Sequence, residues 1–139
     1  MFQRKLPWQR REAPPLKSFQ QELAQFPAYS VRAPRYRAVP IDHIVGSVNR
    51  FRDFDRGFRP RQDRQMWDTP VRVDRLKSLI REGKDLHSVL LYELNGEYYV
   101  EDGHHRVMVA KELGRECVDA TVKEVIPHPG RKASQEAAA

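Results

Sequence analysis

The segment from Glu97 to Gly114 limits the fold of this chain more than any other stretch. Its residues are Glu-Tyr-Tyr-Val-Glu-Asp-Gly-His-His-Arg-Val-Met-Val-Ala-Lys-Glu-Leu-Gly. Tyrosine and valine favour a strand over residues 97–101, and the Asp-Gly pair after them favours a turn. Apolar side chains then recur at helical spacing, and a glycine follows where helices commonly end. The pattern predicts a strand, a tight turn at Gly103 and a helix over residues 104–113.

The start of this helix is the predicted functional site. The first backbone N–H groups of a helix have no intrahelical partner, and the helix dipole makes that end positive. Such a helix start attracts anions, and an adjacent arginine strengthens the attraction for phosphate. Because Gly103 lacks a Cβ atom, a phosphate is expected to approach the backbone closely there. We therefore expect a phosphate site formed by Gly103, His104, His105 and Arg106.

The side chains of this turn suggest distinct roles. Arg106 is expected to contact phosphate with a bidentate pair of hydrogen bonds. His104 and His105 are candidates to donate to phosphate oxygens or to transfer protons near neutral pH, and at least one of them is expected to make a structural hydrogen bond instead. Asp102 either caps the helix or acts in catalysis, as a base or by holding Mg²⁺ through water. The chain lacks a His-x3-His spacing, so no metal site made of protein ligands alone is predicted.

Charge is distributed unevenly along the chain. Residues 1–64 carry 14 Lys and Arg against 6 Asp and Glu, whereas residues 65–139 carry 11 against 13. Arginine supplies 12 of the 14 cations in the first half, which favours contacts with phosphate groups. The basic half is therefore expected either to meet nucleic acid or nucleotide phosphates, or to form a solvated arm.

The basic half also contains a long segment, residues 46–64, in which arginine and phenylalanine are interleaved. We expect a loop without regular structure, which in a compact domain is usually functional or disordered. Its arginines, Arg50 above all, are expected to cover the phosphates, and its phenylalanines are expected both to stack on bases and to anchor the loop on the core. His43 and Asp53 are weaker candidates near the site, and Glu101 is expected to be a strand-end carboxylate. Trp8 and Trp67 are expected to make packing or arm contacts rather than to stack on bases.

Composition excludes several classes of protein. A length of 139 residues suits one domain, and there is no run of about 18 apolar residues that could span a membrane. The N-terminus is rich in arginine and interrupted by proline, so no secretory signal is predicted. The single cysteine, Cys117, has no internal disulfide partner and is expected to be a buried apolar residue of a strand. A cytoplasmic location is the expectation.

The remaining elements follow from periodicity and turn signals. Residues 1–35 are expected to form a basic arm, poorly ordered over 1–15, with an amphipathic helix at 16–26 that packs on the core or on a second subunit. The folded domain is expected at 36–126 and a flexible tail at 127–139. The expected elements of the domain are a strand at 36–41, a turn or single helical turn at 42–45, a helix from Thr69-Pro70 to Gly83, a strand at 88–94, a type I′ turn at Asn95-Gly96, and a strand at 116–125 that Pro127 and Pro129 end. This order predicts a single small α+β domain with a mixed sheet.

This order of elements resembles the ParB/sulfiredoxin superfamily, including the segment often called a ParB-like nuclease domain. The resemblance covers about residues 36–126. The Val-Pro-Ile-Asp-His-Ile sequence at 39–44 is similar to the opening strand and its turn, and the Asn-Arg-Phe-x-Asp sequence at 49–53 is similar to the first ParB box. Residues 73–83 resemble the helix before the hairpin, and residues 103–106 fall on the second box.

The second box relates the turn to three kinds of protein. In ParB proteins it is Gly-Glu-Arg-Arg-x-Arg and binds nucleotide phosphates, and Gly103 and Arg106 match it. In sulfiredoxins it is Gly-Cys-His-Arg, which Gly103, His105 and Arg106 match, but His104 stands in place of the catalytic cysteine. Sulfinic-acid reduction is therefore not expected. The Asp-Gly-His-x-Arg turn also resembles that of ParB-fold kinases of small molecules.

Three hypotheses follow. In the first, a ParB/sulfiredoxin-like domain binds the phosphates of ATP, ADP or CTP at residues 102–106, with Arg50 over them. If it is an enzyme, Mg²⁺-dependent phosphoryl transfer or phosphate-ester hydrolysis is expected, with Asp102, His104 and His105 as the catalytic candidates. In the second, the protein is a non-catalytic DNA- or RNA-binding or regulatory module that uses its basic N-terminal half. In the third, it is a subunit-interaction protein that forms a homodimer through the helix at 16–26.

Overall fold

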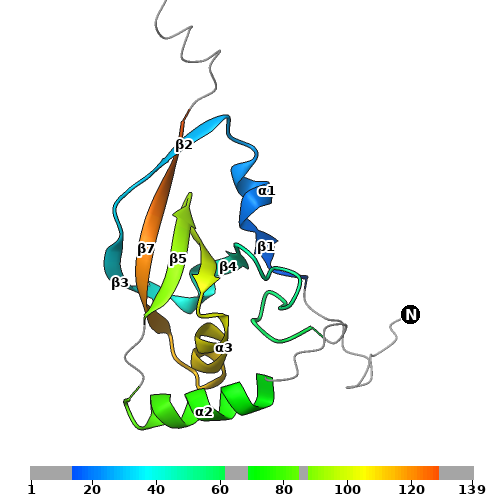
Figure 1. Cartoon of the computed structure of the whole chain (residues 1–139), viewed down its shortest axis with the longest axis vertical. Coiled ribbons are helices and arrows are strands. Elements are labelled where there is room, and N and C mark those ends of the chain that lie inside the picture. Colours follow the sequence, from blue (N-terminus) through cyan, green and yellow to red (C-terminus); the bar gives the residue numbers. More distant parts are fainter. Residues whose placement is uncertain (1–13, 62–68, 85–87, 129–139) are drawn as a thin grey trace, which may run out of the picture.

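The computed structural model describes residues 14–61, 69–84 and 88–128. Strands and helices of this part form one α+β unit, as the sequence predicts (Figure 1). In chain order the elements are β1 (Lys17–Ser18), α1 (Phe19–Leu23), β2 (Ala28–Val31), β3 (Arg35–Pro40), the 3₁₀ helix η2 (Ile41–His43), β4 (Ile44–Ser47), α2 (Thr69–Arg81), β5 (Val89–Leu94), β6 (Glu97–Asp102), α3 (His104–Glu112) and β7 (Cys117–His128).

Seven strands of the described chain form a mixed sheet in the order β1-β4-β6-β5-β7-β2, and β3 also pairs with β7. The β1–β4, β4–β6 and β5–β7 pairs are parallel, whereas β5–β6, β2–β7 and β3–β7 are antiparallel. The long strand β7 serves two partners, since its first half pairs with β3 and its second half with β2. The predicted mixed sheet is therefore confirmed.

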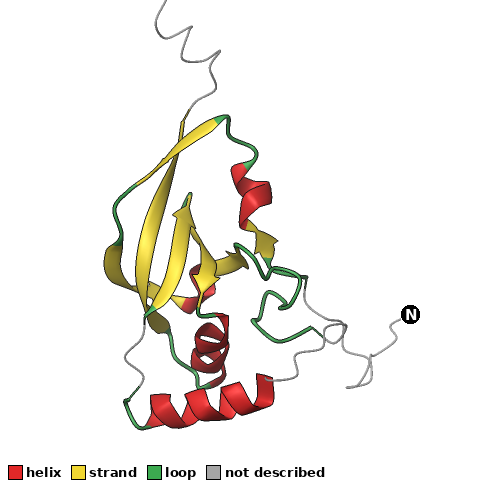
Figure 2. Cartoon of the chain, in the orientation of Figure 1, coloured by secondary structure: helices red, strands yellow, loops and turns green. Residues whose placement is uncertain are grey.

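The two faces of the sheet carry separate apolar cores. Successive residues of a strand point to opposite faces. Accordingly Tyr98 and Val100 of β6 belong to one buried cluster and Tyr99 to the other. Helices α2 and α3 lie together at the lower end of the sheet, whereas α1 lies at the upper right, next to β1 (Figure 2). The larger cluster packs against α3, and the smaller one contains Phe19 of α1.

The hairpin and the second half of the chain match the sequence prediction closely. Asn95 and Gly96 both have positive φ, at 53° and 81°, as a type I′ turn requires, and they join the antiparallel β5 and β6. Gly83, with φ of 68°, follows the end of α2, and Gly114, with φ of 76°, follows the end of α3.

Several expectations for the first half were wrong. The helix expected at residues 16–26 is only the five-residue α1, preceded by β1 and followed by β2, which the sequence pattern did not reveal. Both strands join the sheet, so residues 17–31 share it with the later elements. The single helical turn expected at 42–45 is confirmed as η2, which begins one residue earlier, but it leads directly into β4 where a loop was expected.

Two expectations about β7 were also wrong. The strand continues through Pro127 to His128 instead of ending before that proline. β5 pairs with β7 only as far as Val125, so Pro127 lies where β7 is paired with β2 alone, as sheets tolerate for proline. Cys117, expected to be buried, is exposed because it is the first residue of β7, opposite Pro40 at the end of β3. Of the segments expected to be poorly ordered or flexible, 1–15 and 127–139, residues 1–13 and 129–139 lie outside the described residues, whereas Pro15 pairs with Asp55 in an isolated bridge and residues 127–128 belong to β7.

Candidate functional site

The structure has the predicted strand, turn and helix around Gly103, but a glycine is required there for packing against β5. β6 ends at Asp102, and Gly103 is the N-cap of α3 with a φ of 104° in the left-handed region. A Cβ atom at this position would lie 2.6 Å from Cγ1 of Val89. The glycine therefore allows α3 to pack against β5. Asp102 is not the N-cap, because it lies within β6 with an exposed side chain.

Parallel pairing brings a second segment to the start of α3. Ser47 at the end of β4 pairs with Val100 of β6, and the Val48 N–H donates to the Val100 carbonyl at 2.9 Å. Parallel neighbours end at the same edge of a sheet, so the segment after β4 and the turn after β6 emerge side by side. This places Asn49 and Arg50 next to His104.

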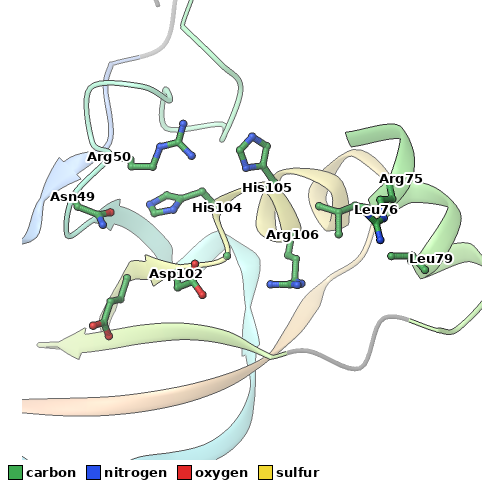
Figure 3. A pocket seen from close by; sticks show the side chains of 11 residues that line it. Asn49, Arg50, Arg75, Leu76, Leu79, Asp102, His104, His105 and Arg106 are labelled. Carbon is green, nitrogen blue, oxygen red and sulfur yellow. The ribbon is translucent and has the colours of Figure 1, made fainter. Parts of the chain in front are cut away.

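A pocket of about 450 Å³ lies between these two segments and α2 (Figure 3). That volume is within the range of about 300–1,000 Å³ typical of small-molecule sites. Its lining residues are Asn49, Arg50, Arg75, Leu76, Leu79, Glu101, Asp102, Gly103, His104, His105 and Arg106. The whole predicted turn and Arg50 thus border one cavity.

Three arginines from three elements border this pocket. Arg50 comes from the loop after β4, Arg75 from α2 and Arg106 from the first turn of α3. Opposing them are the carboxylates of Asp102 and Glu101, and the Glu101 side chain is 3.6 Å from the ammonium of Lys123. The pocket therefore combines an excess of guanidinium groups with the positive end of a helix.

The sequence did not predict that α2 would form one wall of the pocket. Leu76 and Leu79 give the pocket an apolar side, seen at the right of Figure 3 beside Arg75. α2 is held against α3 by packing and by the Lys77–Glu112 ion pair at 2.7 Å. The sequence gives no local signal for this contact, because it joins residues 35 positions apart.

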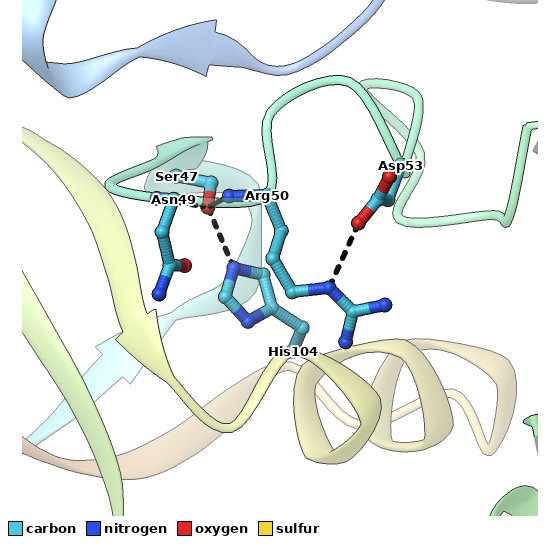
Figure 4. A network of polar contacts seen from close by, with 5 residues as sticks. All are labelled: Ser47, Asn49, Arg50, Asp53 and His104. Carbon is cyan, nitrogen blue, oxygen red and sulfur yellow. Dashed lines mark hydrogen bonds and ion pairs between the residues drawn. The ribbon is translucent and has the colours of Figure 1, made fainter.

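Arg50 is held in place at both its backbone and its side chain (Figure 4). Its N–H donates to Ser47 Oγ at 2.8 Å, and its Nε donates to Asp53 Oδ2 at 3.0 Å. Its guanidinium lies over the ring of Phe54, 5.1 Å from the ring centre. The pairing with Asp53 places that residue beside the site, as the sequence suggested.

The two histidines are buried, with 5% of His104 and 7% of His105 exposed. His104 Nε2 is 2.6 Å from Ser47 Oγ, which confirms the expectation that one of the pair makes a structural hydrogen bond. Its ring stacks on Phe54 at 5.6 Å with an interplanar angle of 10°, and the His105 ring meets Phe54 edge-on at 5.8 Å. Burial, together with the positive charge of Arg50, lowers the pKa of His104 to about 4, so it is neutral at pH 7.

The loop from residue 50 to residue 61 is compact rather than structureless. The carboxylate of Asp55 accepts from the N–H groups of Gly57 and Arg59, at 2.8 and 3.1 Å. The rings of Phe54 and Phe58 are fully buried. These two phenylalanines therefore anchor the loop on the core, as expected, but the base-stacking role also expected for them is wrong because their rings are buried.

The weaker candidate residues do not join the pocket. His43 is exposed in η2 and does not line the pocket, and Trp8 and Trp67 lie outside the described residues.

Within the described ranges no group of three or more His, Cys, Asp and Glu side chains is arranged to hold a metal ion. None of the described helices has the length and hydropathy needed to span a membrane.

Comparison with known proteins finds similarity at the level of the fold alone. No protein-family model matches the chain, and a search of curated proteins finds no significant match. Among solved structures, the fold is similar to those of a sulfiredoxin and of a chromosome-partitioning protein. The first is sulfiredoxin from Arabidopsis thaliana, with a TM-score of 0.47 and 20% identity over 75% of this chain and 96% of that one.

The second is the C-terminally truncated chromosome-partitioning protein ParB from Caulobacter crescentus, complexed with CTP-γ-S. Its TM-score is 0.44 and its identity 23%, over 74% of this chain. The match spans 49% of that ParB chain. At these values the likeness concerns the arrangement of strands and helices alone.

Proposed function

We propose that the protein binds the phosphate groups of a nucleotide in the pocket at the start of α3. The observation that carries this proposal is the convergence of Arg50, Arg75 and Arg106 on one cavity beside the first turn of a helix. Guanidinium groups form bidentate hydrogen bonds with phosphate, and a helix N-terminus adds N–H donors and a positive dipole. The apolar side formed by Leu76 and Leu79 suits the uncharged part of such a ligand.

Binding is tested by thermal unfolding with ATP, ADP, CTP and GTP, each with and without Mg²⁺. A ligand at about 100 times its Kd adds about 2.7 kcal/mol to the free energy of unfolding. We expect stabilisation by at least one nucleotide, lost in Arg50→Ala and in Arg106→Ala. Arg59→Ala is the matched control, because Arg59 is exposed and does not line this pocket. A folded wild-type protein that no nucleotide stabilises would contradict the proposal.

The reaction that suits such a site is Mg²⁺-dependent phosphoryl transfer or phosphate-ester hydrolysis. Catalysis of this kind depends mainly on positioning and on neutralising charge on the phosphoryl group. Asp102, exposed at the pocket, is the carboxylate best suited to hold Mg²⁺ through water. Phosphate release from ATP or CTP should then require Mg²⁺ and should be lost in Asp102→Asn while nucleotide stabilisation without Mg²⁺ remains. Release that persists unchanged in this variant would contradict the role of Asp102.

A further inference from the structure

Ser47 is a fully buried hydroxyl with three hydrogen-bonding partners. Its Oγ lies 2.8 Å from the N–H nitrogen of Arg50, 3.3 Å from that of Asn49 and 2.6 Å from Nε2 of His104. The exposed fraction of its side chain is 0%. A hydroxyl group offers one hydrogen to donate and two lone pairs to accept. The two backbone N–H groups occupy both lone pairs, so the hydroxyl hydrogen points to His104.

This count fixes the tautomer of His104. Nε2 accepts the Ser47 hydroxyl hydrogen and therefore carries no proton, so the proton of the neutral ring is on Nδ1. Burial and the positive charge of Arg50 disfavour a second proton, consistent with the lowered pKa of the ring. Protonated His104 would present an N–H to a serine oxygen whose lone pairs are already used.

The ring of His104 borders the phosphate pocket. Nδ1 makes no hydrogen bond within the described part of the chain, and it is not among the buried polar atoms there that lack a partner. It therefore reaches solvent, and the cavity that His104 borders is the phosphate pocket. An uncharged donor at this point adds a hydrogen bond to an anion without requiring a protonated histidine.

The same histidine also supports Arg50. One link is the Ser47 hydroxyl, which accepts the N–H groups of Asn49 and Arg50 and so fixes the backbone after β4. The other is the Phe54 ring, which stacks on His104 and lies beneath the Arg50 guanidinium. The start of α3 and the segment that presents Arg50 are thus joined through one ring.

We propose that Ser47 and His104 form a positioning pair for the phosphate pocket, in which Ser47 holds His104 as the neutral Nδ1–H tautomer facing the ligand and both residues hold Arg50 over it. This inference rests on the proposed phosphate site. Ser47 is a positioning residue because it is buried away from the cavity, whereas His104 also donates to the ligand.

The tautomer is tested directly by long-range ¹H–¹⁵N NMR spectra of the histidine side chains at pH 7, with His104 assigned by comparison with His104→Gln. We expect an unprotonated Nε2 and a protonated Nδ1 in the wild-type protein, and a changed Nε2 signal in Ser47→Ala. A wild-type His104 with its proton on Nε2 would overturn the inference, whether or not the protein binds phosphate.

The positioning role is tested by calorimetric titration of the folded protein with inorganic pyrophosphate and with ATP, ADP, CTP and GTP. Ser47→Ala and His104→Leu should each weaken binding about tenfold or more, the loss expected for one or two hydrogen bonds. The double variant should lose less than the product of the single losses, because the residues act as a unit. His104→Gln retains an acceptor and a donor and should stay within about threefold of the wild type.

The outcomes separate the two proposals. If the wild-type protein binds none of these probes, the proposed function fails and the ligand-binding role of the pair fails with it. If the wild-type protein binds and both Ser47→Ala and His104→Leu, verified as folded by circular dichroism, bind equally well, the phosphate site stands and the positioning pair is wrong.

Discussion

The absence of a side chain at Gly103 determines how α3 is placed relative to the sheet. Gly103 has a φ of 104°, and a Cβ atom there would meet the Val89 side chain at 2.6 Å and its Cα at 3.3 Å. Both the backbone conformation and the close approach to β5 exclude other residues. The glycine is thus a packing requirement of the fold, and it sets the position from which the first turn of α3 faces the pocket.

Gly103→Ala should destabilise the protein by about 3 kcal/mol, combining left-handed strain with overpacking against Val89. Gly96→Ala is the matched control, because Gly96 also has a positive φ, of 81°, but nothing lies within 4 Å of the added methyl group. That control should lose only about 1 kcal/mol. Urea unfolding of both variants measures the difference, and equal losses would show that Val89 moves aside.

The buried His104 should make stability depend on pH. Burial, then Arg50 and His105, lower the pKa of His104 from 6.5 to about 4, whereas Asp53 acts in the opposite direction. Between these pH values the unfolded chain binds more protons than the folded one, so stability is complete above pH 6.5 and falls as the pH is lowered towards 4. The loss expected from this group is about 3 kcal/mol.

The measurement is the free energy of unfolding of wild type and His104→Gln between pH 7 and about pH 4, compared as a difference. Contributions from all other groups are common to both proteins and cancel in the difference. We expect the wild type to lose more stability than the variant as the pH falls. Parallel curves would mean that His104 is protonated as easily in the folded protein as in the unfolded chain.

At the scale of elements, α1 is a short helix whose stability comes from one aromatic anchor. Phe19 is 5% exposed, and its ring stacks on Tyr92 at 4.9 Å and meets Tyr99 at 5.3 Å. Five residues are too few for an independently stable helix. The helix is therefore formed by docking onto the face of the sheet opposite α3, through side chains of its own chain.

Phe19→Ala should cost about 3–5 kcal/mol, the usual loss for a buried phenylalanine. Leu23→Ala, at the half-buried end of the same helix, should cost only about 1 kcal/mol. Chemical unfolding at two protein concentrations measures both variants and bears on the homodimer expected through this helix. If a second subunit supplied the stability, the midpoint of the wild type would rise with protein concentration, whereas docking within one chain predicts no change.

The contrast between the two halves of the chain shows what local sequence can specify. The 88–114 region has a type I′ turn, strand formers and glycine stops, and its elements were predicted within a residue or two at each end. β1, β2 and β4 are two to four residues long and exist only through pairing with β4, β7 and β6, which no local pattern records. The amphipathic spacing of residues 16–26 was real, but proline and strand pairing restricted the helix to α1.

The residues of the site likewise fall into those that the sequence predicted and those that it did not. The turn at 102–106 could be predicted because a glycine, two histidines and an arginine at a helix start are contiguous. Arg50 was anticipated from the arginine-rich loop, and the structure brings it to the same cavity. Ser47 was missed, although a serine two and three residues before Asn49 and Arg50 is a local signal for side-chain bonds to their N–H groups. Arg75, Leu76 and Leu79 could not be predicted, since they reach the pocket only through packing of α2 on α3.

At the scale of the whole molecule, the arginines that line the pocket have to be distinguished from those exposed outside it. The chain carries a formal net charge of +6, with an excess of 8 cations in residues 1–64. Arg50, Arg75 and Arg106 face one pocket, whereas Arg52 and Arg59 are exposed on the loop outside it. A nucleotide needs the first set, and a nucleic-acid polyanion, the alternative partner, would draw on the second because it requires an extended basic surface.

The two partners therefore predict opposite patterns of variants and salt dependence. If the pocket is the site, Arg50→Ala and Arg106→Ala abolish nucleotide stabilisation while the exposed pair Arg52→Ala with Arg59→Ala leaves it unchanged. If the protein is a nucleic-acid-binding module, the double variant Arg52→Ala with Arg59→Ala binds a single-stranded oligonucleotide more weakly than the wild type. The slope of log K against log salt then becomes less steep by about 0.7 for each phosphate that the variant no longer neutralises. Fluorescence anisotropy over a salt series measures that slope. An oligonucleotide affinity that falls steeply with salt, together with no stabilisation by any nucleotide, would assign the basic half the main function and leave the pocket without one.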